Sequence, residues 1–592
     1  MPKPINTALQ MELITRADQQ LAEHLLALES TAIENLDLFI ALTSAALRQG
    51  HVCLSLKTDT SLEVLGVSVD LEALAAASIV ANQGAGGQPL VLAGSRLYLA
   101  RYYVWEQQII ADLARLQQSR PIGLNLDLLK QGLAEQFSQP AVGIDWQRAA
   151  ACLAVINSLC IISGGPGTGK TYTVARILRL LLDQQSNANT DEPMRIALTA
   201  PTGKAAGRLT ESILAADATL LEEIPQAQTL HRLLKMRPGR VMPYFNRANP
   251  LSIDVLIVDE VSMVDLPMMA RILAALPQHA RLILLGDRYQ LGSIEAGQVM
   301  ADLCGTGGRE YSQQLVDELT PICGDSLPVA QTQLTNMSSH VITLQHSRRF
   351  DANKGIGRLA AAINAGDSEQ VLSTLEQADD QYDGQLDGQL RWQGSNETSL
   401  DALLLEQVLP LFKQVQQSTN PAEALALLSN LRVLCAVHEG PQGVKAINRK
   451  LEKHLGTAER QLYHGKPLMI TVNHYEQQLF NGDIGLVLRA EDGELRVFFL
   501  TVNGSVRSIA PSRLPAHETV YAMTIHKSQG SEFKQVILVL PQIDSPVVSR
   551  ELLYTGITRA QEKVIVCAGE TALIKAVNKQ AGHDSGLFLA LW

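Results

Sequence analysis

A glycine-rich segment that ends in lysine and threonine constrains this chain more than any other feature. It fits the pattern G-x-x-x-x-G-K-[ST] and consists of Gly164, Gly165, Pro166, Gly167, Thr168, Gly169, Lys170 and Thr171. In such a phosphate loop the backbone N–H groups surround phosphate oxygens, the lysine reaches the β- and γ-phosphates, and the threonine holds Mg²⁺. The apolar run 159–162 predicts a preceding strand, and residues 171–182 predict a helix whose N-terminus meets the phosphates. The sequence therefore predicts a nucleoside-triphosphate site.

The length and composition indicate a globular protein of several domains. At 592 residues the chain is too long for one core, and three or four domains are expected. Its apolar runs are too short to cross a bilayer, and its first residues lack the pattern of a secretion signal. The seven cysteines are scattered without C-x-x-C spacing, which predicts buried, reduced thiols. Together these features predict a cytoplasmic protein.

The net charge of −11 argues mildly against a nucleic-acid binder, because such proteins often carry a basic patch. It does not exclude a protein that holds a few phosphates in a local groove. It would also suit a subunit that is held by larger partners.

The order of apolar runs predicts an α/β protein with a leading helical domain. Residues 1–124 are rich in Leu and Ala at helical spacing and carry no catalytic pattern, which favours a regulatory or docking domain. Residues 140–345 repeat strand, loop and helix, as in a doubly wound nucleotide-binding core. Its predicted strands are 159–162, 196–199, 255–258 and 282–285.

A second core is predicted over residues 346–592, with strands at 433–436, 536–540 and 564–568. The polar segment 373–399, with its Asp-Gly pairs, predicts surface loops. Within the second core, residues 463–514 contain Asn481-Gly482, Asp492-Gly493 and Asn503-Gly504, which are hairpin signals. This insert is predicted to be a small, SH3-like antiparallel barrel.

Polar residues that follow the predicted strands are candidates for the hydrolysis of a nucleoside triphosphate. Asp259 can hold Mg²⁺, the adjacent Glu260 can polarise the attacking water, and Gln290 can sense the γ-phosphate. From the second half, Arg559 and Arg349 are candidates to neutralise charge in the transition state. A helix cap at Asp259, a turn at Gln290 and surface positions for the arginines are the alternatives.

Taken in order, these segments resemble the motif series of superfamily 1 helicases. Asp145-Trp146-Gln147 resembles the motif that contacts adenine, and segments 200–206 and 229–234 look like strand-gripping motifs. The match is closer still to the RecD family of helicase subunits, through residues 51–54, 259–269, 480–485, 511–519 and 526–533. One departure is Arg348, where the family pattern leads us to expect an aromatic residue; which of Arg348 and Arg349 faces the γ-phosphate stays open.

The resemblance implies a motor of two RecA-like cores that close on ATP and Mg²⁺ and travel 5′→3′ on single-stranded DNA. One wall of the site would be formed by Lys170, Asp259, Glu260 and Gln290, and the other by Gly530 and Arg559. It also implies RecB and RecC as partners at duplex ends, with the leading domain on RecC and the insert guiding DNA. Contacts to DNA phosphates are expected from Thr202, Lys204, Thr229, His231, Thr524, His526 and Lys527, although caps, a packed histidine and a solvated lysine are the structural alternatives.

Other functions remain as alternatives. A stand-alone helicase of the same superfamily would carry the same motifs. A nucleotide-gated subunit that regulates a nuclease would not need the full hydrolytic set of Glu260, Gln290 and Arg559. A phosphotransferase is disfavoured because no acceptor site is evident and the second core would be unexplained.

Overall fold

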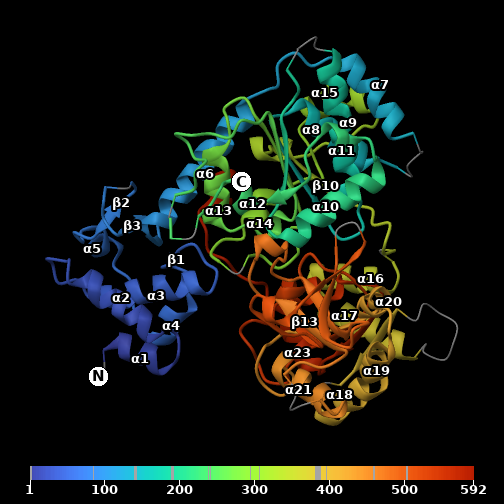
Figure 1. Cartoon of the computed structure of the whole chain (residues 1–592). Coiled ribbons are helices and arrows are strands. Elements are labelled where there is room, and N and C mark those ends of the chain that lie inside the picture. The colour runs from blue at the N-terminus through green and yellow to red at the C-terminus, as the bar shows by residue number, and fades with distance from the viewer. Residues whose placement is uncertain are drawn as a thin grey trace.

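The computed structural model describes residues 3–592 except 85, 139–142, 188–191, 238, 241, 294, 306, 352, 381–388, 395, 458–460 and 502–503. Within these residues the strands form four sheets, two of them parallel and part of the two α/β cores (Figure 1). The chain runs from an N-terminal part through the first core into the second, and its last helix returns to the first core.

The N-terminal part combines short helices with a small sheet that was not predicted. Its helices are α1 (Pro4–Gln10), α2 (Arg16–Leu26), α3 (Leu36–Arg48), α4 (Thr60–Leu65) and α5 (Leu71–Ala75). The sheet has the order β1 (Leu54–Ser55), β4 (Arg96–Leu99), β3 (Leu90–Ala93) and β2 (Val80–Asn82). Strands of two to four residues are too short to show an alternating pattern, which is why the sequence predicted a mainly helical domain and gave no sign of this sheet. The long helix α6 (Ala100–Gln118) leads into the first core.

The first core is a six-stranded parallel sheet with helices on both faces. Its order is β10 (Val341–Leu344), β5 (Leu159–Gly164), β9 (Arg281–Gly286), β8 (Val255–Val258), β6 (Ile196–Ala200) and β7 (Gln228–Thr229). Along β5, Cys160 and Ile162 pack on one face, with α8 (Trp146–Ile156), α9 (Lys170–Asn187) and α15 (Gln313–Cys323). Leu159 and Ile161 pack on the other, with α6, α13 (Leu266–Ala275) and α14 (Val299–Cys304). Burial on both faces explains the continuous apolar runs of the four predicted strands.

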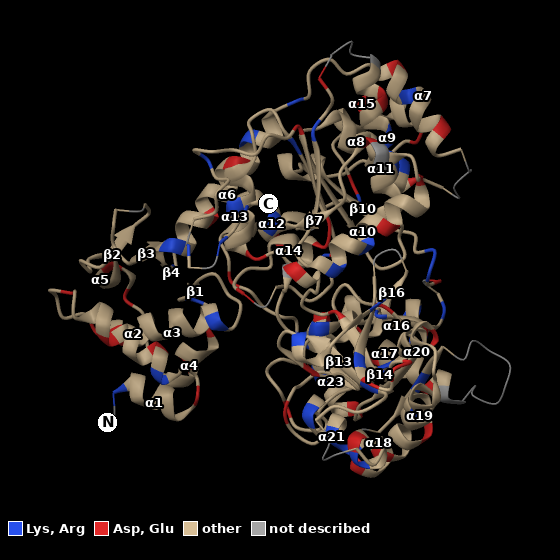
Figure 2. Cartoon of the chain, in the orientation of Figure 1, with Lys and Arg blue, Asp and Glu red and all other residues tan. Residues whose placement is uncertain are grey.

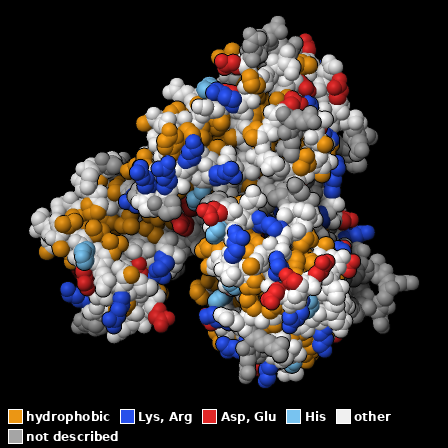
Figure 3. Space-filling model, viewed as in Figure 1, with side chains coloured by type: hydrophobic (Ala, Val, Ile, Leu, Met, Phe, Trp, Pro, Cys, Tyr) orange, Lys and Arg blue, Asp and Glu red, His pale blue; other side chains and the backbone are white. Residues whose placement is uncertain are grey.

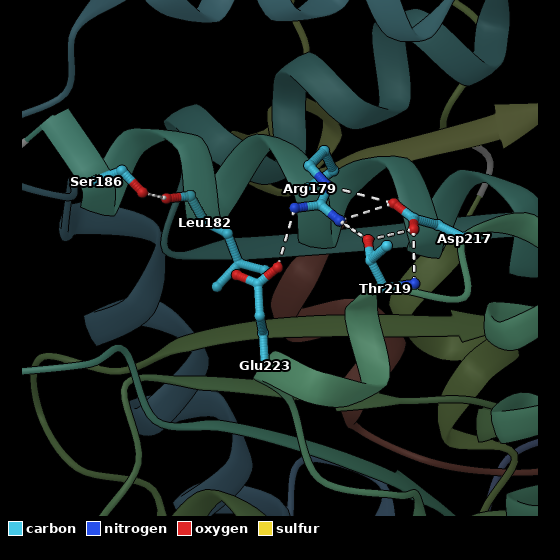
Figure 4. Close-up of polar contacts among 6 residues, drawn as sticks. All are labelled: Arg179, Leu182, Ser186, Asp217, Thr219 and Glu223. Atoms are coloured by element: carbon cyan, nitrogen blue, oxygen red, sulfur yellow. Dashed lines mark hydrogen bonds and ion pairs between the residues drawn. The ribbon is translucent and has the colours of Figure 1, made fainter.

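Helix α9, which begins at Lys170, is fixed to its neighbours by Arg179 (Figure 4). The Arg179 guanidinium donates to Asp217 Oδ2 at 2.8 Å, to Thr219 Oγ1 at 2.6 Å and to Glu223 Oε1 at 3.1 Å. Asp217 ends α10 (Gly203–Ala216), and Glu223 ends α11 (Leu220–Glu223). These bonds therefore hold α9, the helix that follows the phosphate loop, against α10.

The second core repeats the architecture with a five-stranded parallel sheet. Its order is β11 (Leu390–Gln393), β20 (Ala560–Cys567), β19 (Phe533–Val539), β12 (Leu431–Cys435) and β18 (Ala522–Thr524). One face is covered by α16 (Gly355–Ala365), α17 (Ser368–Asp380), α22 (Arg550–Ile557) and α23 (Glu570–Asn578). The other is covered by α18 (Glu397–Leu403), α19 (Leu409–Gln417), α20 (Pro421–Leu428) and α21 (Val444–His454).

The prediction of surface loops over 373–399 is wrong for most of the described part of that segment. Helix α17 continues to Asp380, β11 pairs with β20, and α18 begins at Glu397. Only one residue of β11, Leu390, is deeply buried, so this edge strand lacks the apolar run of the central strands. The two Asp-Gly pairs of the segment lie outside the described residues.

The insert is an antiparallel sheet of five strands. They are, in order, β16 (Val506–Ile509), β15 (Leu495–Leu500), β14 (Ile484–Arg489), β13 (Lys466–Ile470) and β17 (His517–Thr519). The hairpin at Asp492-Gly493 is confirmed, since β14 and β15 pair on either side of it. Asn481-Gly482 lies instead near the end of the long connection between β13 and β14, and Asn503 lies outside the described residues. Pairing within the described part leaves β16 and β17 as edges, so an open sheet stands where a closed barrel was predicted. The domain limits given above stay predictions.

Two further expectations can be compared with the structure. All seven cysteines are free and buried, which confirms the interpretation of them as packed thiols. Among the residues that the structure describes, no helix has both the length and the apolar character needed to cross a membrane.

Candidate nucleotide site between the two cores

The phosphate loop joins the end of β5 to the start of α9, and neighbouring side chains enclose it. Gly167 and Gly169 have φ angles of 77° and 83°, a region that favours glycine. A methyl group on Gly167 would collide with Arg349, and one on Gly169 would collide with the Gln147 amide. The Gln147 amide donates to Thr168 O at 2.8 Å. The sequence pattern thus reflects both backbone conformation and close packing.

Three ionisable side chains of the first core converge on this loop. The Lys170 ammonium donates to Gly164 O at 2.6 Å and to Gly165 O at 3.3 Å. Burial raises the pKa of Asp259 above its usual range, the neighbouring Glu260 adds to the effect, and Lys170 opposes it. Glu260 has a left-handed backbone, with φ of 54°, and its N–H donates to Asp259 Oδ1 at 2.8 Å. Such backbone strain in a non-glycine residue is typical of functional sites.

Asp287 links Gln290 to the second core. The Gln290 amide and the Tyr554 hydroxyl both donate to Asp287 Oδ2, at 3.1 Å and 2.9 Å. Burial raises the pKa of the Asp287 carboxyl, and Lys170 opposes this shift. Neither Asp287 nor Tyr554 was predicted to act, because their pairing spans 267 residues.

The two candidate arginines lie at the boundary between the cores in different surroundings. The Arg349 Nη2 donates to Glu532 Oε2 at 2.7 Å, while its Nη1 is buried without a partner. Arg559 is 3% exposed, and its guanidinium donates to Thr555 O at 3.1 Å and Ser531 O at 3.4 Å. Gly530, with φ of 69°, approaches Ala205 of the first core. Arg349 therefore has a donor available for a ligand.

A pocket of about 330 Å³ lies beside the phosphate loop. Gln147, Thr168, Tyr172 and Arg348 line it, and the Arg348 guanidinium lies 5.5 Å from the centre of the Tyr172 ring. A flat aromatic or guanidinium surface beside an amide is suited to a nucleotide base. The adjacent arginines thus point to different parts of the site: Arg348 to this pocket and Arg349 to Glu532.

Most of the predicted DNA-contacting residues have structural partners within the chain. Thr202 caps α10 and Thr229 caps α12 (Leu230–Leu233), which begins just before His231. Thr524 Oγ1 accepts from the backbone of Lys527, whose ammonium pairs with Glu518 at 2.7 Å. Burial lowers the pKa of His526.

Lys204 is the predicted DNA contact that reaches across to the second core. Its ammonium donates to Ser531 Oγ at 2.7 Å, and burial lowers its pKa to about 7, with Arg208 adding to the shift and Asp483 opposing it. Asp483 belongs to the insert, and a methyl on Gly203 would collide with the insert's Phe480. The insert therefore lies against the start of α10. No local sequence pattern predicted this contact.

The residues predicted to hold Mg²⁺ are chemically suited to it. Thr171 and Asp259 supply a hydroxyl and a carboxylate, the oxygen donors that this ion prefers. A cation would also offset the repulsion between the Asp259 and Glu260 carboxylates. No group of three or more His, Cys, Asp or Glu side chains that could hold a metal occurs in the described part of the chain, so the remaining ligands would be phosphate and water.

Two parallel α/β cores that meet at one phosphate loop, taken with the family matches that follow, define a superfamily 1 helicase. Residues 147–296 match the family described as an AAA domain, and residues 519–567 match the UvrD-like helicase C-terminal domain. Residues 10–98 match the N-terminal domain of the RecBCD enzyme subunit RecD.

The similar proteins extend this match over nearly the whole chain. The RecBCD enzyme subunit RecD of Mycolicibacterium smegmatis is 37% identical over 97% of this chain and 97% of its own length. That of Haemophilus influenzae is 36% identical over 84% of this chain and 80% of its own. The chain belongs to the RecD family, the helicase subunits of an enzyme of recombinational repair. The resemblance seen in the sequence is confirmed.

More distant proteins share parts of the chain. The ATP-dependent RecD2 DNA helicase of Deinococcus radiodurans is 29% identical over 73% of this chain and 50% of its own length. A crystal structure of Pif1 helicase from Bacteroides in complex with ADP-AlF3 and ssDNA is 15% identical, with a TM-score of 0.39, over 74% of this chain and 94% of its own.

Proposed function

We propose that this chain hydrolyses ATP to move 5′→3′ along single-stranded DNA, as the RecD-type subunit of a complex with RecB and RecC. The observation that carries the proposal is the pair of contacts across the phosphate loop. Asp287 of the first core bonds Tyr554 of the second, and Arg349 of the second core, which bonds Glu532, lies against Gly167 of the loop. A site built from both cores lets nucleotide binding and release open and close them, which a motor requires.

Each residue of the site has a proposed task. Lys170 binds the β- and γ-phosphates, Thr171 and Asp259 hold Mg²⁺, and Glu260 accepts a proton from the attacking water. The metal supplies charge neutralisation at the phosphates when it is bound. Gln290, Arg349 and Arg559 stabilise the charge that develops on the γ-phosphate, with Gly530 in the second wall.

Strand gripping is assigned to groups at the carboxyl ends of the strands of both cores. Thr229 and Thr524 are the last residues of β7 and β18. The others follow β6, β7 and β18, and they are Thr202, Lys204, His231, His526 and Lys527. Such donors hold phosphates without reading sequence. Because Thr202 and Thr229 also cap helices, their hydroxyls would contribute through helix position as well as through direct contact.

The N-terminal part is proposed as the docking surface for RecC. Figure 3 shows hydrophobic side chains gathered on its visible face, over α2, α3 and α5. In the same part of the chain Met11, Leu28 and Val64 are 49%, 65% and 59% exposed, and a partner would cover such apolar side chains. Figure 2 shows charges of both signs spread over the chain rather than one basic face. With a net charge of −11, this distribution favours DNA binding within a complex.

The test compares unwinding of a duplex that carries a 5′ single-stranded tail with one that carries a 3′ tail. We expect ATP-dependent unwinding from the 5′ tail alone, and its loss in Lys170→Gln. If the isolated chain unwinds neither, addition of RecB and RecC separates an obligate subunit from a nucleotide-gated regulator. Unaided, processive unwinding by a stable monomer would favour a stand-alone helicase instead.

A further inference from the structure

The hydroxyl of Tyr554 connects the second core to the phosphate loop of the first. Tyr554 lies on α22, and its hydroxyl donates to Asp287 Oδ2 at 2.9 Å. A methyl group built on Gly165 would lie 2.9 Å from this hydroxyl and 3.9 Å from the Asp287 carboxylate. The second core thus places a polar group directly against the loop that receives the phosphates.

Asp287 also bonds other groups of the site. Its Oδ1 accepts from the Tyr289 backbone at 3.1 Å, and its Oδ2 accepts from both Tyr554 and Gln290. Burial and the neighbouring carboxylate raise the pKa of Tyr554 well above its usual value, so the hydroxyl keeps its proton and acts as the donor. The position of the Gln290 amide therefore depends on an oxygen that Tyr554 helps to hold.

We propose that Tyr554 is a positioning residue through which the second core responds to the nucleotide, by holding Asp287 and Gln290 at the phosphate loop. The inference rests on the proposed function, and it assigns to Tyr554 the coupling between nucleotide binding and DNA binding. A γ-phosphate beside Gly165 draws the Lys170 ammonium away from the carbonyls that it now contacts and brings negative charge toward Asp287. The strength of the hydrogen bond from Tyr554 to Asp287 then differs between the ATP and ADP states. A residue that couples two sites must make contacts that differ between the two states.

Tyr554→Phe isolates the hydroxyl, because the phenylalanine ring keeps the edge contact with Tyr289, whose ring centre lies 6.2 Å away. In the full-length chain, the affinity for single-stranded DNA is measured with a non-hydrolysable ATP analogue and with ADP. The ratio of the two affinities is the coupling. We expect the variant to bring this ratio about tenfold closer to one, the effect of losing one hydrogen bond to a carboxylate.

Tyr521→Phe is the matched control, since it removes another buried hydroxyl of the second core. The Tyr521 hydroxyl bonds that of Tyr463, which lies at the start of the insert and not at the phosphate loop. A purely structural role for Tyr554 predicts that both variants lower thermal stability and leave the affinity ratio unchanged. That result would overturn the inference.

Gly165→Ala tests the same contact from the opposite side. The added methyl displaces the Tyr554 hydroxyl, so it should reduce the ratio in the native chain but not further in Tyr554→Phe. An equal reduction in both backgrounds would contradict the inference. If the native chain itself binds DNA equally with both nucleotides, the proposed motor function fails; a native ratio that Tyr554→Phe leaves intact removes only the role of Tyr554.

Discussion

Arg348 and Arg349 are adjacent, yet their side chains predict different kinetic effects. Arg349→Ala removes a guanidinium with one buried, unpartnered nitrogen at the phosphate loop, and we expect kcat for ATP hydrolysis to fall by about 10³-fold. Arg348→Ala opens the pocket beside Tyr172, so KM for ATP should rise several-fold with kcat nearly unchanged. Steady-state hydrolysis with saturating single-stranded DNA measures both. A large loss of kcat in Arg348→Ala alone would reverse the assignment.

Lys204 predicts that DNA binding depends on pH. Burial lowers the pKa of its ammonium to about 7, and a DNA phosphate placed against it would favour the charged form and raise that pKa again. Binding would then take up a proton at pH values above about 7, so affinity should fall by up to tenfold per pH unit between pH 7 and 9. Fluorescence anisotropy at constant salt measures this slope.

Lys204→Gln should flatten the slope, because no titrating ammonium remains at that position. Lys527→Gln is the control, since it removes an exposed charge that is paired with Glu518 and leaves the buried ammonium in place. Equal slopes in the native chain and in Lys204→Gln would show that Lys204 does not contact the bound strand.

At the scale of elements, the packing of the insert against α10 depends on Gly203, the first residue of that helix. Gly203→Ala would place a methyl group against the Phe480 ring and push the 480–483 turn away from Lys204. Overpacking of this kind typically costs about 1–3 kcal/mol, and we expect a matching loss in the free energy of unfolding. Denaturant titration measures it. Phe480→Ala should relieve the loss in the double variant, and the absence of any relief would mean that the two elements do not meet in solution.

Elements that a continuous sequence pattern defines could be predicted from the sequence. Contacts between elements that are distant in the sequence could not. Strand β5, which ends at Gly164, and strand β8, which precedes Asp259, contain continuous apolar runs buried on both faces, so their positions were predictable. Strand β11 has one deeply buried residue, and its pairing with β20 joins Leu390 to Val564. The bond from Tyr554 to Asp287 likewise depends on how the cores face each other, which no single segment encodes.

At the scale of the whole molecule, the C-terminal tail ties three parts of the chain together. Asp302 of α14 accepts from His583 at 2.8 Å and from Ser585 at 2.9 Å. The Asp584 N–H donates to His51 Nδ1 at 2.9 Å, and the Asp584 carbonyl accepts from the Val52 N–H at 2.8 Å, which joins the tail to the N-terminal part. The Gly586 N–H donates to Glu106 on α6 at 2.8 Å. The tail that leaves the second core is therefore fixed to the first core and to the N-terminal part (Figure 1).

This attachment should weaken as pH rises. Burial lowers the pKa of His583, but the bond to Asp302 outweighs it and the net pKa is raised. A histidine whose pKa is raised on folding stabilises fully below about pH 6.5, and that contribution is lost as pH increases through the raised value. Burial also raises the pKa of Glu106, so the stability that this carboxyl contributes likewise falls with rising pH, starting above about pH 4.5. Hydrogen exchange of residues 580–592 should therefore accelerate, as the pH rises above about 6.5, by more than the intrinsic rate.

Asp302→Asn tests the attachment directly, because it removes the charged acceptor that His583 and Ser585 share. Charge-assisted bonds of this kind contribute about 1.5–3 kcal/mol each, so the variant should expose the tail to exchange already at pH 6 and lose most of the pH dependence. Asp544→Asn is the control: its exposed pair with Lys575 lies on the second core, and no change is expected. Because the tail spans both cores, its release should also loosen the N-terminal part, seen as faster exchange at His51 and Val52. Protection there that is unchanged in Asp302→Asn would show that the N-terminal part is held by its own contacts with α6 instead.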